Sequence, residues 1–517
     1  MAIPAPIQRR QAARRRARAA AGGLGPSVYQ EPYRAGSRNR HLSRWQPSNV
    51  SADSAIGVGN DLLAARIRDL ERNDPLGKAA QRKMVLRSVG TGIDIKSAVT
   101  RDGEPWEEHN REVDRLFERY IRRQADVRGK RSLYQMQRVV IGELEGPGEA
   151  LILRCYDPDP QRLVPICYQL LEGEQLDAMK SAPATDTTPE IVRGVELDAF
   201  QRPLAYWLFD GHPWGVNPLR SAVSKRYDAS RVIHLYEWTR PSQTRGVTPY
   251  TATIPTSNDL DWFITSVLKS AHIQTLFTVA LHRASGQQGT GLGFGETTDA
   301  AGGAIAWDLP TIERLGSGIL ADLGQYDKIE TIGPKHPGPS FEPFVKLLLL
   351  ILAAGRGLSY VGLTGDYSQT NYSSAMAAGN DDYEVIKVVQ QDFCYDFADE
   401  VHRDFVASAA AAGLLTHCTA KQFQSDPEYW LASTFHPPGR GMVDEERESA
   451  SSLLRIFSGQ STFRDELARR GLDWRDVFAQ LEREWRDLRD RGVDVNLQML
   501  TFALARAANR PLEGTAA

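Results

Sequence analysis

Residues Gly355–Met376 read GRGLSYVGLTGDYSQTNYSSAM and lie between two apolar segments. The preceding segment, Phe341–Ala354, is rich in leucine. In the following segment, residues 383–405, apolar side chains recur every three or four positions, which is the spacing of one face of a helix. The sequence therefore predicts two helices that display a polar loop, Thr364–Ser374, in which Asp366 is the one charged residue.

The residues alone leave two interpretations of this loop open. Gly355, Gly357 and Gly362 indicate places where the backbone needs conformational freedom, as in an ordinary connection between two helices. The other interpretation is a loop that offers hydroxyl, amide and tyrosine side chains to something outside the fold. The candidate site residues of that loop are Thr364, Asp366, Tyr367, Ser368, Gln369, Thr370, Asn371, Tyr372 and Ser373.

The same stretch resembles the most recognisable segment of the lambda-type phage portal proteins, whose pattern runs roughly AAG-G-SYE-LT-DYS-TNYSSAR. Val361 stands where that family often has a carboxylate, and Met376 stands where it usually has arginine. The matching residues are Ala353, Ala354, Gly355, Gly357, Ser359, Tyr360, Leu363, Thr364, Asp366, Tyr367, Ser368, Thr370, Asn371, Tyr372, Ser373, Ser374 and Ala375.

Three further motifs resemble the same family, in the same order along the chain. They are residues 66–73 (RIRDLERN), 89–93 (VGTGI) and 238–249 (WTRPSQTRGVTP). In the third motif, Arg240 and Arg245 could grip a phosphate or a carboxylate with paired donors. We favour a structural clamp instead, because the block is irregular and rich in turn-forming residues.

The resemblance covers most of residues 50–490 and implies an α+β multidomain subunit of the portal type. Such a subunit has an α/β wing, long stem helices, a small clip insertion and a C-terminal helical crown. The implied ranges are 1–48 for a basic disordered arm, 49–250 for the first part of the wing, 251–283 for a stem helix, 284–338 for the clip, 339–356 for a second stem helix, 357–380 for the tunnel loop, 381–440 for a long helix and the return to the wing, and 441–517 for the crown and tail.

The resemblance also implies a function. Portal proteins form a ring, by family expectation a dodecamer, at one capsid vertex, and they conduct DNA during packaging and ejection. The implied partners are other copies of the chain, the large terminase, a head-tail adaptor, the major capsid and scaffold proteins, and double-stranded DNA in the channel. We expect a virion component made in the host bacterial cytoplasm, with no membrane partner and no cofactor.

Composition excludes several other classes. A chain of 517 residues is long enough for several domains, and its net charge of −3 argues against a surface that grips phosphates throughout. No apolar run approaches the roughly 18–20 residues that span a bilayer, and no signal peptide is recognisable. The cysteines have neither CxxC nor zinc spacing, so we expect free thiols at Cys155, Cys167, Cys394 and Cys418.

The first 48 residues are biased in composition. Arginines cluster among alanines before the first acidic residue, Glu31, which predicts disorder in the free chain. Either this arm touches DNA or a neighbouring acidic surface, or it is a solvated tail. The arginines concerned are Arg9, Arg10, Arg14, Arg15, Arg16 and Arg18.

Periodicity predicts the remaining elements. We expect helices at residues 51–80 with a break at 73–75, and at 107–123, 256–283 (capped by Thr256 or Ser257), 449–457, 462–470 and 473–491. We expect strands at residues 150–156, 163–171, 191–198, 205–209 and 232–236, and short strands and turns within 299–338, including 315–323 and 329–332.

The sequence shows no catalytic motif. It contains no GxxxxGK[ST], HExxH or GxSxG, and its ten histidines are dispersed. Asp381 and Asp382 are adjacent and therefore point about 100° apart on a helix, so they form no acid/base pair, and we attribute them to dipole stabilisation near a helix start. Scattered aspartates at turns are expected to cap backbone groups and not to bind metal. These are Asp157, Asp159, Asp198 and Asp210.

A conduit for DNA agrees with these observations, because a channel lined by many cations would bind the duplex tightly. The loop Thr364–Ser374 contains no Lys or Arg. Two other classes remain open at this point. One is a nucleic-acid-binding scaffold protein without a channel, and the other is an unrecognised DNA enzyme.

Overall fold

The computed structural model describes residues 47–57, 59–216, 223–276, 280–283, 327–330, 341–441 and 445–491. For residues 273–276, 280–283, 327–330 and 445–446 it describes the backbone alone. Nearly all of the predicted arginine-rich arm and of the predicted clip lies outside these ranges, so those predictions stay open. Every element below belongs to the unit that begins at Ala52.

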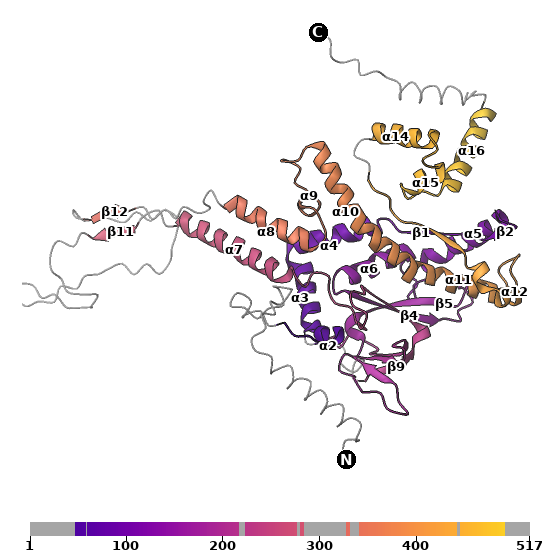
Figure 1. The fold of residues 1–517 in the computed structure, drawn as a ribbon, viewed down its shortest axis with the longest axis horizontal. Coiled ribbons are helices and arrows are strands. Elements are labelled where there is room, and N and C mark those ends of the chain that lie inside the picture. Colours follow the sequence, from indigo (N-terminus) through magenta and orange to yellow (C-terminus); the bar gives the residue numbers. More distant parts are fainter. Residues whose placement is uncertain are drawn as a thin grey trace, which may run out of the picture. The chain divides into compact units, whose positions relative to one another are not determined.

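Helices and strands alternate irregularly along the chain, which makes this a mixed α+β fold (Figure 1). The helices are α2 Ala52–Gly57, α3 Asn60–Asn73, α4 Pro75–Ser88, α5 Glu107–Arg123, α6 Leu133–Glu145, α7 Ile254–Leu276, α8 Phe341–Gly355, α9 Tyr360–Thr364, α10 Tyr372–Phe393, α11 Asp399–Ala411, α12 Ala420–Ser425, α13 Pro427–Trp430, α14 Glu445–Phe457, α15 Phe463–Ala468 and α16 Trp474–Asp490.

The strands form several small antiparallel sheets. They are β1 Asp94–Ser97, β2 Thr100–Arg101, β3 Glu104–Pro105, β4 Glu149–Tyr156, β5 Ile166–Glu172, β6 Glu190–Val192, β7 Val195–Leu197, β8 Pro203–Leu208, β9 Lys225–Asp228, β10 Val232–Tyr236, β11 Ala280–Arg283, β12 Asp327–Glu330 and β13 Ser433–His436. The larger sheets have the orders β10-β4-β5 and β6-β7-β8-β9, while β1 pairs with β13 and β11 with β12.

Strand β4 shows how the central sheet is buried on both faces. Side chains alternate along a strand, so neighbours point to opposite faces. Ala150 and Ile152 join the main core with residues of α5, α6 and α11, whereas Leu151 and Leu153 pack in a second core with residues of β7 and β8. Burial on both faces explains why this strand is almost continuously apolar and was predictable from sequence.

The long helix after the quoted stretch forms the other side of the main core. Helical backbone continues from Tyr372 through a π-helical turn, Cys394–Ala398, to Ala411. Phe397, Val401 and Phe405 are fully buried, which confirms the predicted apolar stripe. Phe405 packs on Phe117 of α5 at a ring-centroid distance of 5.1 Å.

A buried ion pair joins the central sheet to the third motif. Arg245 donates from Nε and Nη2 to the two oxygens of Glu149, each at 2.7 Å, and also to the carbonyl oxygen of Gly173 at 3.1 Å. His234 Nε2 lies 2.7 Å from the same carboxylate. Both side chains of the pair are 3–4% exposed, so Arg245 is the structural clamp that the sequence favoured.

His402 occupies the same core without a hydrogen-bond partner on either ring nitrogen among the described residues. Burial lowers its pKa to about 4 from an ordinary 6.5. At pH 5 the His402 ring is therefore protonated in the unfolded chain but not in the folded chain. The folded state loses stability as the pH falls.

Because one pKa unit corresponds to 1.36 kcal/mol, we expect His402 to lower the free energy of unfolding by about 2 kcal/mol when the pH falls from 7 to 5. In His402→Leu this contribution should vanish, whereas the partly exposed His417→Leu should keep it. Urea unfolding of both variants and the parent chain at the two pH values measures the difference. Equal pH dependence in all three proteins would rule out the assignment.

Several predicted elements agree closely with the structure. The helix at 107–123 has the bounds of α5, and the strand at 232–236 has those of β10. Asp74 caps α4 at the predicted break, accepting from the backbone nitrogens of Leu76 and Gly77 at 3.0 Å each. The three C-terminal helices are present, and Thr462 caps the second of them by accepting from the backbone nitrogen of Asp465.

Other predictions were wrong. Residues 191–198 are not one strand, because Arg193 and Gly194 adopt positive φ and turn the chain between β6 and β7. The helix predicted at 256–283 begins at Ile254, so Thr256 and Ser257 lie inside it and do not cap it. It ends at Leu276, and residues 280–283 form a strand antiparallel to 327–330. Helix α6 was missed, although Ser132 and Gln135 form a capping box at its start.

Candidate functional site

The candidate loop is shorter than its sequence predicted. Helix α9, Tyr360–Thr364, interrupts the region expected to be a loop, and α10 begins at Tyr372. The non-helical segment is therefore Gly365–Asn371, which we call the polar loop. The expected loop at 357–380 was too long because Asn371 caps α10, its Oδ1 accepting from the backbone nitrogen of Ser374 at 2.8 Å.

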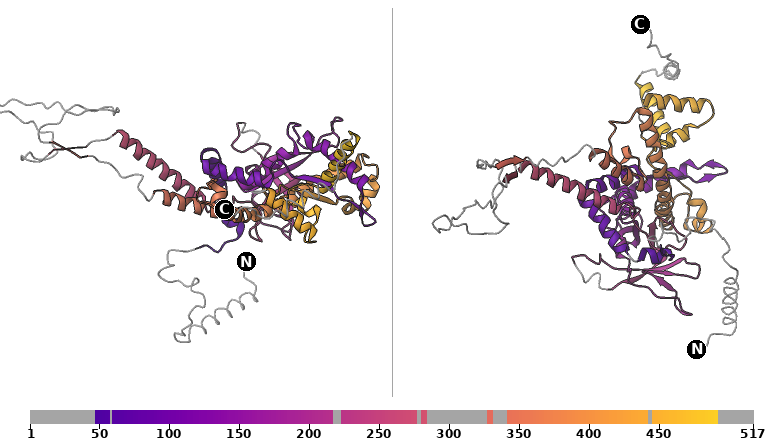
Figure 2. Two further views of the ribbon diagram at one scale, coloured as in Figure 1. Left: turned by 90° about the horizontal axis from the view of Figure 1, so that it is seen from above. Right: turned by 60° about the vertical axis from the view of Figure 1, so that its left-hand side comes forward.

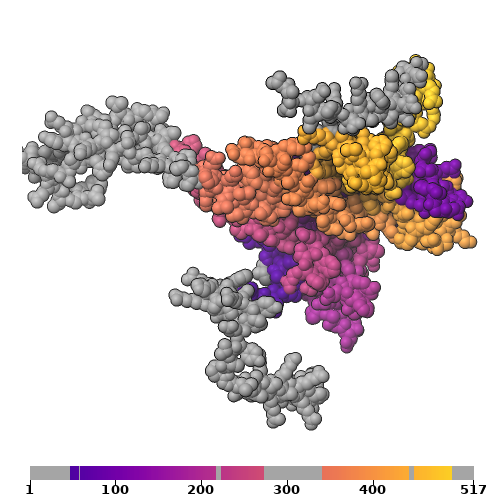
Figure 3. Space-filling view, turned by 45° about the horizontal axis from the view of Figure 1, so that its top comes forward, coloured from indigo at the N-terminus to yellow at the C-terminus, as the bar shows by residue number. Residues whose placement is uncertain are grey.

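Two paired helices precede the loop. Figures 1 and 2 show α7 and α8 side by side, and Phe263 of α7 stacks on Phe341 of α8 with ring centroids 5.7 Å apart. Leu260, Leu352 and Leu363 share one buried cluster, so α9 is packed against the same pair. In the space-filling view, α8, α9 and α10 (orange) make one continuous part of the surface (Figure 3).

Some candidate residues maintain the shape of the polar loop. Asp366 Oδ1 accepts from the backbone nitrogen of Ser368 at 3.0 Å, and Tyr360 donates its hydroxyl to Oδ2 at 3.4 Å. The hydrogen bonds from Ser368 lower the pKa of Asp366, so it carries its negative charge at neutral pH. Thr364 Oγ1 donates to the carbonyl oxygen of Tyr360 and accepts from the backbone nitrogen of Asp366.

Other candidate residues face solvent. Tyr367 is 59% exposed and Tyr372 is 43% exposed, although both are large aromatic side chains. Ser368, Gln369 and Ser373 are exposed as well, while Thr370 is half-buried. The structure thus separates the nine candidates. Thr364, Asp366 and Asn371 shape the loop, whereas the exposed side chains belong to the loop and to the first two residues of α10, Tyr372 and Ser373.

An arginine from a distant part of the sequence lies beside the N-terminal part of α10. Met376 replaces the arginine usual in the resembled pattern, but Arg440, from the segment after β13, places its guanidinium against Met376 Sδ and Asn380 Oδ1. Arg440 Nη2 also lies 3.4 Å from Glu448 Oε1. A positive charge is therefore present beside this part of α10, although position 376 itself carries none.

The adjacent carboxylates of α10 have different environments. Asp381 is exposed, whereas Asp382 is buried and accepts from the backbone nitrogen of Ser359 at 2.6 Å, from Ser359 Oγ at 3.1 Å and from Arg87 Nη1 at 2.9 Å. The explanation by helix dipole was wrong, because α10 starts at Tyr372 and Asp382 lies in its third turn. The side chain instead binds the segment before α9.

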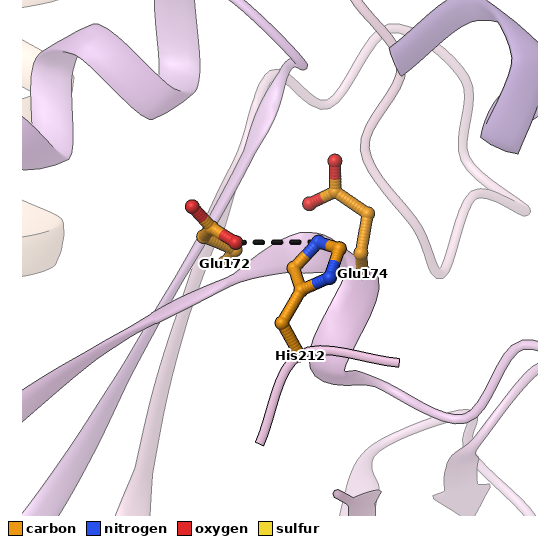
Figure 4. Close-up of side chains that lie close together, drawn as sticks. All are labelled: Glu172, Glu174 and His212. Carbon is orange, nitrogen blue, oxygen red and sulfur yellow. Dashed lines mark ion pairs between the residues drawn. The ribbon is translucent and has the colours of Figure 1, made fainter. Parts of the chain in front are cut away.

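Among the described residues, one cluster has the composition of a metal site: Glu172, Glu174 and His212, whose ligand atoms lie within 4.8 Å of one another (Figure 4). His212 Nδ1 accepts from the backbone nitrogen of Trp214 at 3.1 Å, so Nε2 carries the proton and faces Glu172 Oε2 at 3.3 Å. In this arrangement the Nε2 proton faces the Glu172 carboxylate, and a metal ion would have to displace it.

Glu174 is committed elsewhere in the same cluster. Both of its oxygens accept from Arg68, at 2.7 and 2.9 Å. Burial alone would raise the pKa of Glu174, but the hydrogen bonds and charge of Arg68 outweigh it, and the pKa is lowered. The cluster is therefore a hydrogen-bonded ion network, and it offers no prepared metal site.

The aspartates expected at turns do occupy turns. Asp157 pairs with Arg162 at 2.7 Å, and Asp159 accepts from the backbone nitrogen of Gln161 at 2.9 Å. Asp198 accepts from the backbone nitrogens of Phe200 and Arg202, each at 2.8 Å. Asp210 pairs with Lys225.

Among the helices that the structure describes, none combines the length and the apolar character of a membrane span.

Comparison with known proteins decides the family. The family model described as "Phage portal protein, lambda family" matches residues 38–390, which is more than half of the chain. The chain belongs to the lambda family of phage portal proteins. A probable portal protein of Halomonas phage phiHAP-1 is 26% identical over 455 residues, covering 86% of this chain and 83% of that protein. Portal protein B of Escherichia phage lambda is 22% identical over 474 residues, covering 87% and 88%.

Solved structures from particle necks are similar at low sequence identity. A chain from the neck of an empty GTA particle computed with C6 symmetry has a TM-score of 0.44 and 13% identity, covering 78% of this chain and 93% of that chain. A chain from the neck of a native GTA particle computed with C12 symmetry has a TM-score of 0.42 and 13% identity, covering 80% and 98%.

Membership of the portal family answers the question of function that the residues left open. The protein is a phage portal protein, the head-tail connector at the capsid vertex through which DNA passes. It is a virion component, and the family is structural and non-enzymatic. The alternatives of a scaffold without a channel and of an unrecognised DNA enzyme are therefore set aside.

Proposed function

We propose that this portal protein closes into a ring of about twelve copies and that the polar loop, Gly365–Asn371, lines the channel as its tunnel loop. The observation that carries the proposal is the surface of the loop. It presents Tyr367, Ser368 and Gln369 to solvent and contains no Lys or Arg. Asp366 is its one charge, and that charge is held inside the turn.

A DNA duplex that must slide through the channel requires a lining without many cationic side chains. Each phosphate that a cationic side chain neutralises releases counterions, so a ring of cations would hold the duplex and make its passage strongly salt-dependent. Hydroxyl and amide groups hydrogen-bond weakly and without sequence preference. The presented side chains therefore support contact with DNA that is close but not tight.

The paired helices supply a surface for the neighbouring copy. Large apolar side chains on α7 and α8 are 44–63% exposed in the single chain, and contiguous apolar surface usually marks an interface. A ring covers such a face on every subunit with the same chain. The exposed residues are Trp262, Leu268, Phe344, Leu347, Leu350 and Ile351.

Leu350→Glu should therefore weaken the ring. A buried unpaired carboxylate at each contact should raise the concentration needed for assembly by about tenfold or more. Leu204→Glu on β8 is a matched control, because Leu204 is 40% exposed against 44% for Leu350. Size-exclusion chromatography with light scattering should show about 0.7 MDa for the control, twelve times 57.5 kDa, and mainly smaller species for Leu350→Glu. Rings of equal stability would contradict the proposed interface.

The division into parts follows the same proposal. The wing would comprise residues 49–250 and 381–440, the stem residues 251–283 and 339–356, the clip residues 284–338 and the crown residues 441–517. The β11–β12 pair would then stand where the stem passes into the clip. In this arrangement the clip meets the large terminase and later the head-tail adaptor, and the wing meets capsid and scaffold proteins.

We also propose that the arginine-rich arm, residues 1–48, contacts DNA or an acidic neighbouring surface. Its support is compositional, since the arginines from Arg9 to Arg18 precede any acidic residue. Deletion of residues 1–20 tests the idea. Unchanged DNA packaging and particle assembly would end it.

A further inference from the structure

Helix α9 is held at its start by a carboxylate from another helix. Asp382 accepts from the backbone nitrogen and the hydroxyl of Ser359, the residue that caps α9, and is itself paired with Arg87 of α4 at 2.9 Å. The Asp382 side chain is 3% exposed. Three donors thus converge on one buried carboxylate, which joins α4, α9 and α10 at a single point.

The other end of α9 is held by a lysine. Lys83 of α4 donates from Nζ to the carbonyl oxygens of Gly362 and Leu363, at 2.8 and 3.0 Å. The last carbonyl groups of a helix have no partner within it, so an ammonium group is favourable there. Lys83 and Arg87 are one turn apart on α4; Lys83 contacts the end of α9 directly, and Arg87 acts on its start through Asp382.

Two glycines with positive φ flank α9, and the Asp382 carboxylate packs against it. Gly357 before it and Gly365 after it have φ of 67° and 74°, and Gly365 is the first residue of the polar loop. A Cβ on Gly362 would lie 2.2 Å from Asp382 Oδ2, so the carboxylate sits directly against the helix. A helix of five residues is too short to be stable by itself. Its position therefore depends on these contacts.

We propose that Asp382, Arg87 and Lys83, together the α9 latch, are positioning residues that set where the polar loop stands in the channel. The inference rests on the proposed role of that loop as the tunnel loop. The latch acts through α9, because the last residue of α9, Thr364, is joined directly to Gly365. Lys83 lies 279 positions from Gly362 in the sequence, and Arg87 lies 295 positions from Asp382, so only the fold brings them together.

Hydrogen exchange in the assembled ring measures the latch directly. Asp382→Asn removes the charge from the latch, while Asp381→Asn removes the same charge from the exposed neighbouring position on α10. We expect amide exchange in residues 358–366 to be about tenfold faster in Asp382→Asn than in Asp381→Asn, which corresponds to a loss of about 1.4 kcal/mol in local stability. Exchange in β4 should be equal in both.

A second pair of variants keeps the test decisive if Asp382→Asn fails to assemble. Lys83→Met removes the two bonds to the end of α9 and keeps an apolar stem, and Lys78→Met makes the same change at an exposed position of α4. The same acceleration over residues 358–366 is expected for Lys83→Met alone. If exchange there is unchanged in every latch variant that forms rings, the latch proposal is wrong.

DNA packaging by the same rings separates the two proposals. Faster exchange together with a fall in packaged DNA for Asp382→Asn, relative to Asp381→Asn, supports both the latch and the tunnel loop. Faster exchange with normal packaging would uphold the contacts of the latch but overturn its functional role, along with the proposal that the polar loop meets DNA. Unchanged exchange in residues 358–366 would contradict the latch proposal but would not bear on the proposal that the polar loop is the tunnel loop.

Discussion

Rings carrying Gln369→Arg should assemble normally but package and release DNA at least about tenfold more slowly than the parent at low salt. Gln369 is exposed on the polar loop, so the substitution disturbs no buried contact. In a ring of about twelve copies it places about as many new cations around the duplex. Since the logarithm of binding affinity changes by roughly 0.9 per neutralised phosphate and per decade of salt, even a few contacts would hold the DNA.

The salt dependence of the rate distinguishes phosphate contacts from other causes of slow packaging. Raising the salt concentration should restore much of the lost rate, because phosphate contacts weaken steeply with salt. Gln369→Glu is the control, since it has nearly the same shape and adds the opposite charge. The rate of DNA packaging, measured at two salt concentrations, decides between the variants. Equal rates for the two charges would show that Gln369 does not meet the duplex.

Glu149→Ala should lower the free energy of unfolding by about 3–5 kcal/mol, the cost of leaving one partner of a buried ion pair alone. Arg245 is 3% exposed and would lose both of its 2.7 Å bonds to the carboxylate. The double variant Glu149→Leu/Arg245→Met should recover most of the loss, because no unpaired charge remains buried. Urea unfolding of the parent, single and double variants measures both values.

The same ion pair predicts a pH dependence. Burial alone would raise the pKa of Glu149, but the charge of Arg245 and the hydrogen bonds from His234 and Arg245 outweigh it and hold the pKa well below its ordinary 4.5. The unfolded chain therefore takes up a proton there before the folded chain does, and the stabilisation present above pH 4.5 is lost as the pH falls further. A single variant no less stable than the parent at pH 7 would contradict this account.

Local patterns predicted those elements whose burial follows a regular period. The stripe of α5, the apolar run of β4 and the stripe from Phe393 to Phe405 were readable for that reason. Pairing between strands far apart in the sequence could not be predicted from local patterns. The segment 280–283 continues the apolar pattern of α7, and only its pairing with residues 327–330 makes it a strand.

The candidate site shows the same division. The polar character of the loop and its place between helices were predictable from Gly355–Met376. Helix α9 was not, because it is short, lies among glycines and is held by side chains from α4 and α10. Asp382 carried no local signal of its role, since its partner Arg87 is 295 positions away. The capping box at Ser132 was a readable signal for α6 that was overlooked.

A reconstruction of the assembled ring by electron cryomicroscopy tests the central claim most directly. The account predicts a closed ring of about twelve copies in which residues 365–371 of every subunit are the part of the chain nearest the axis. A ring in which these residues stand on the outer surface, or a purified protein that never closes into a ring even with its capsid partners present, would contradict it.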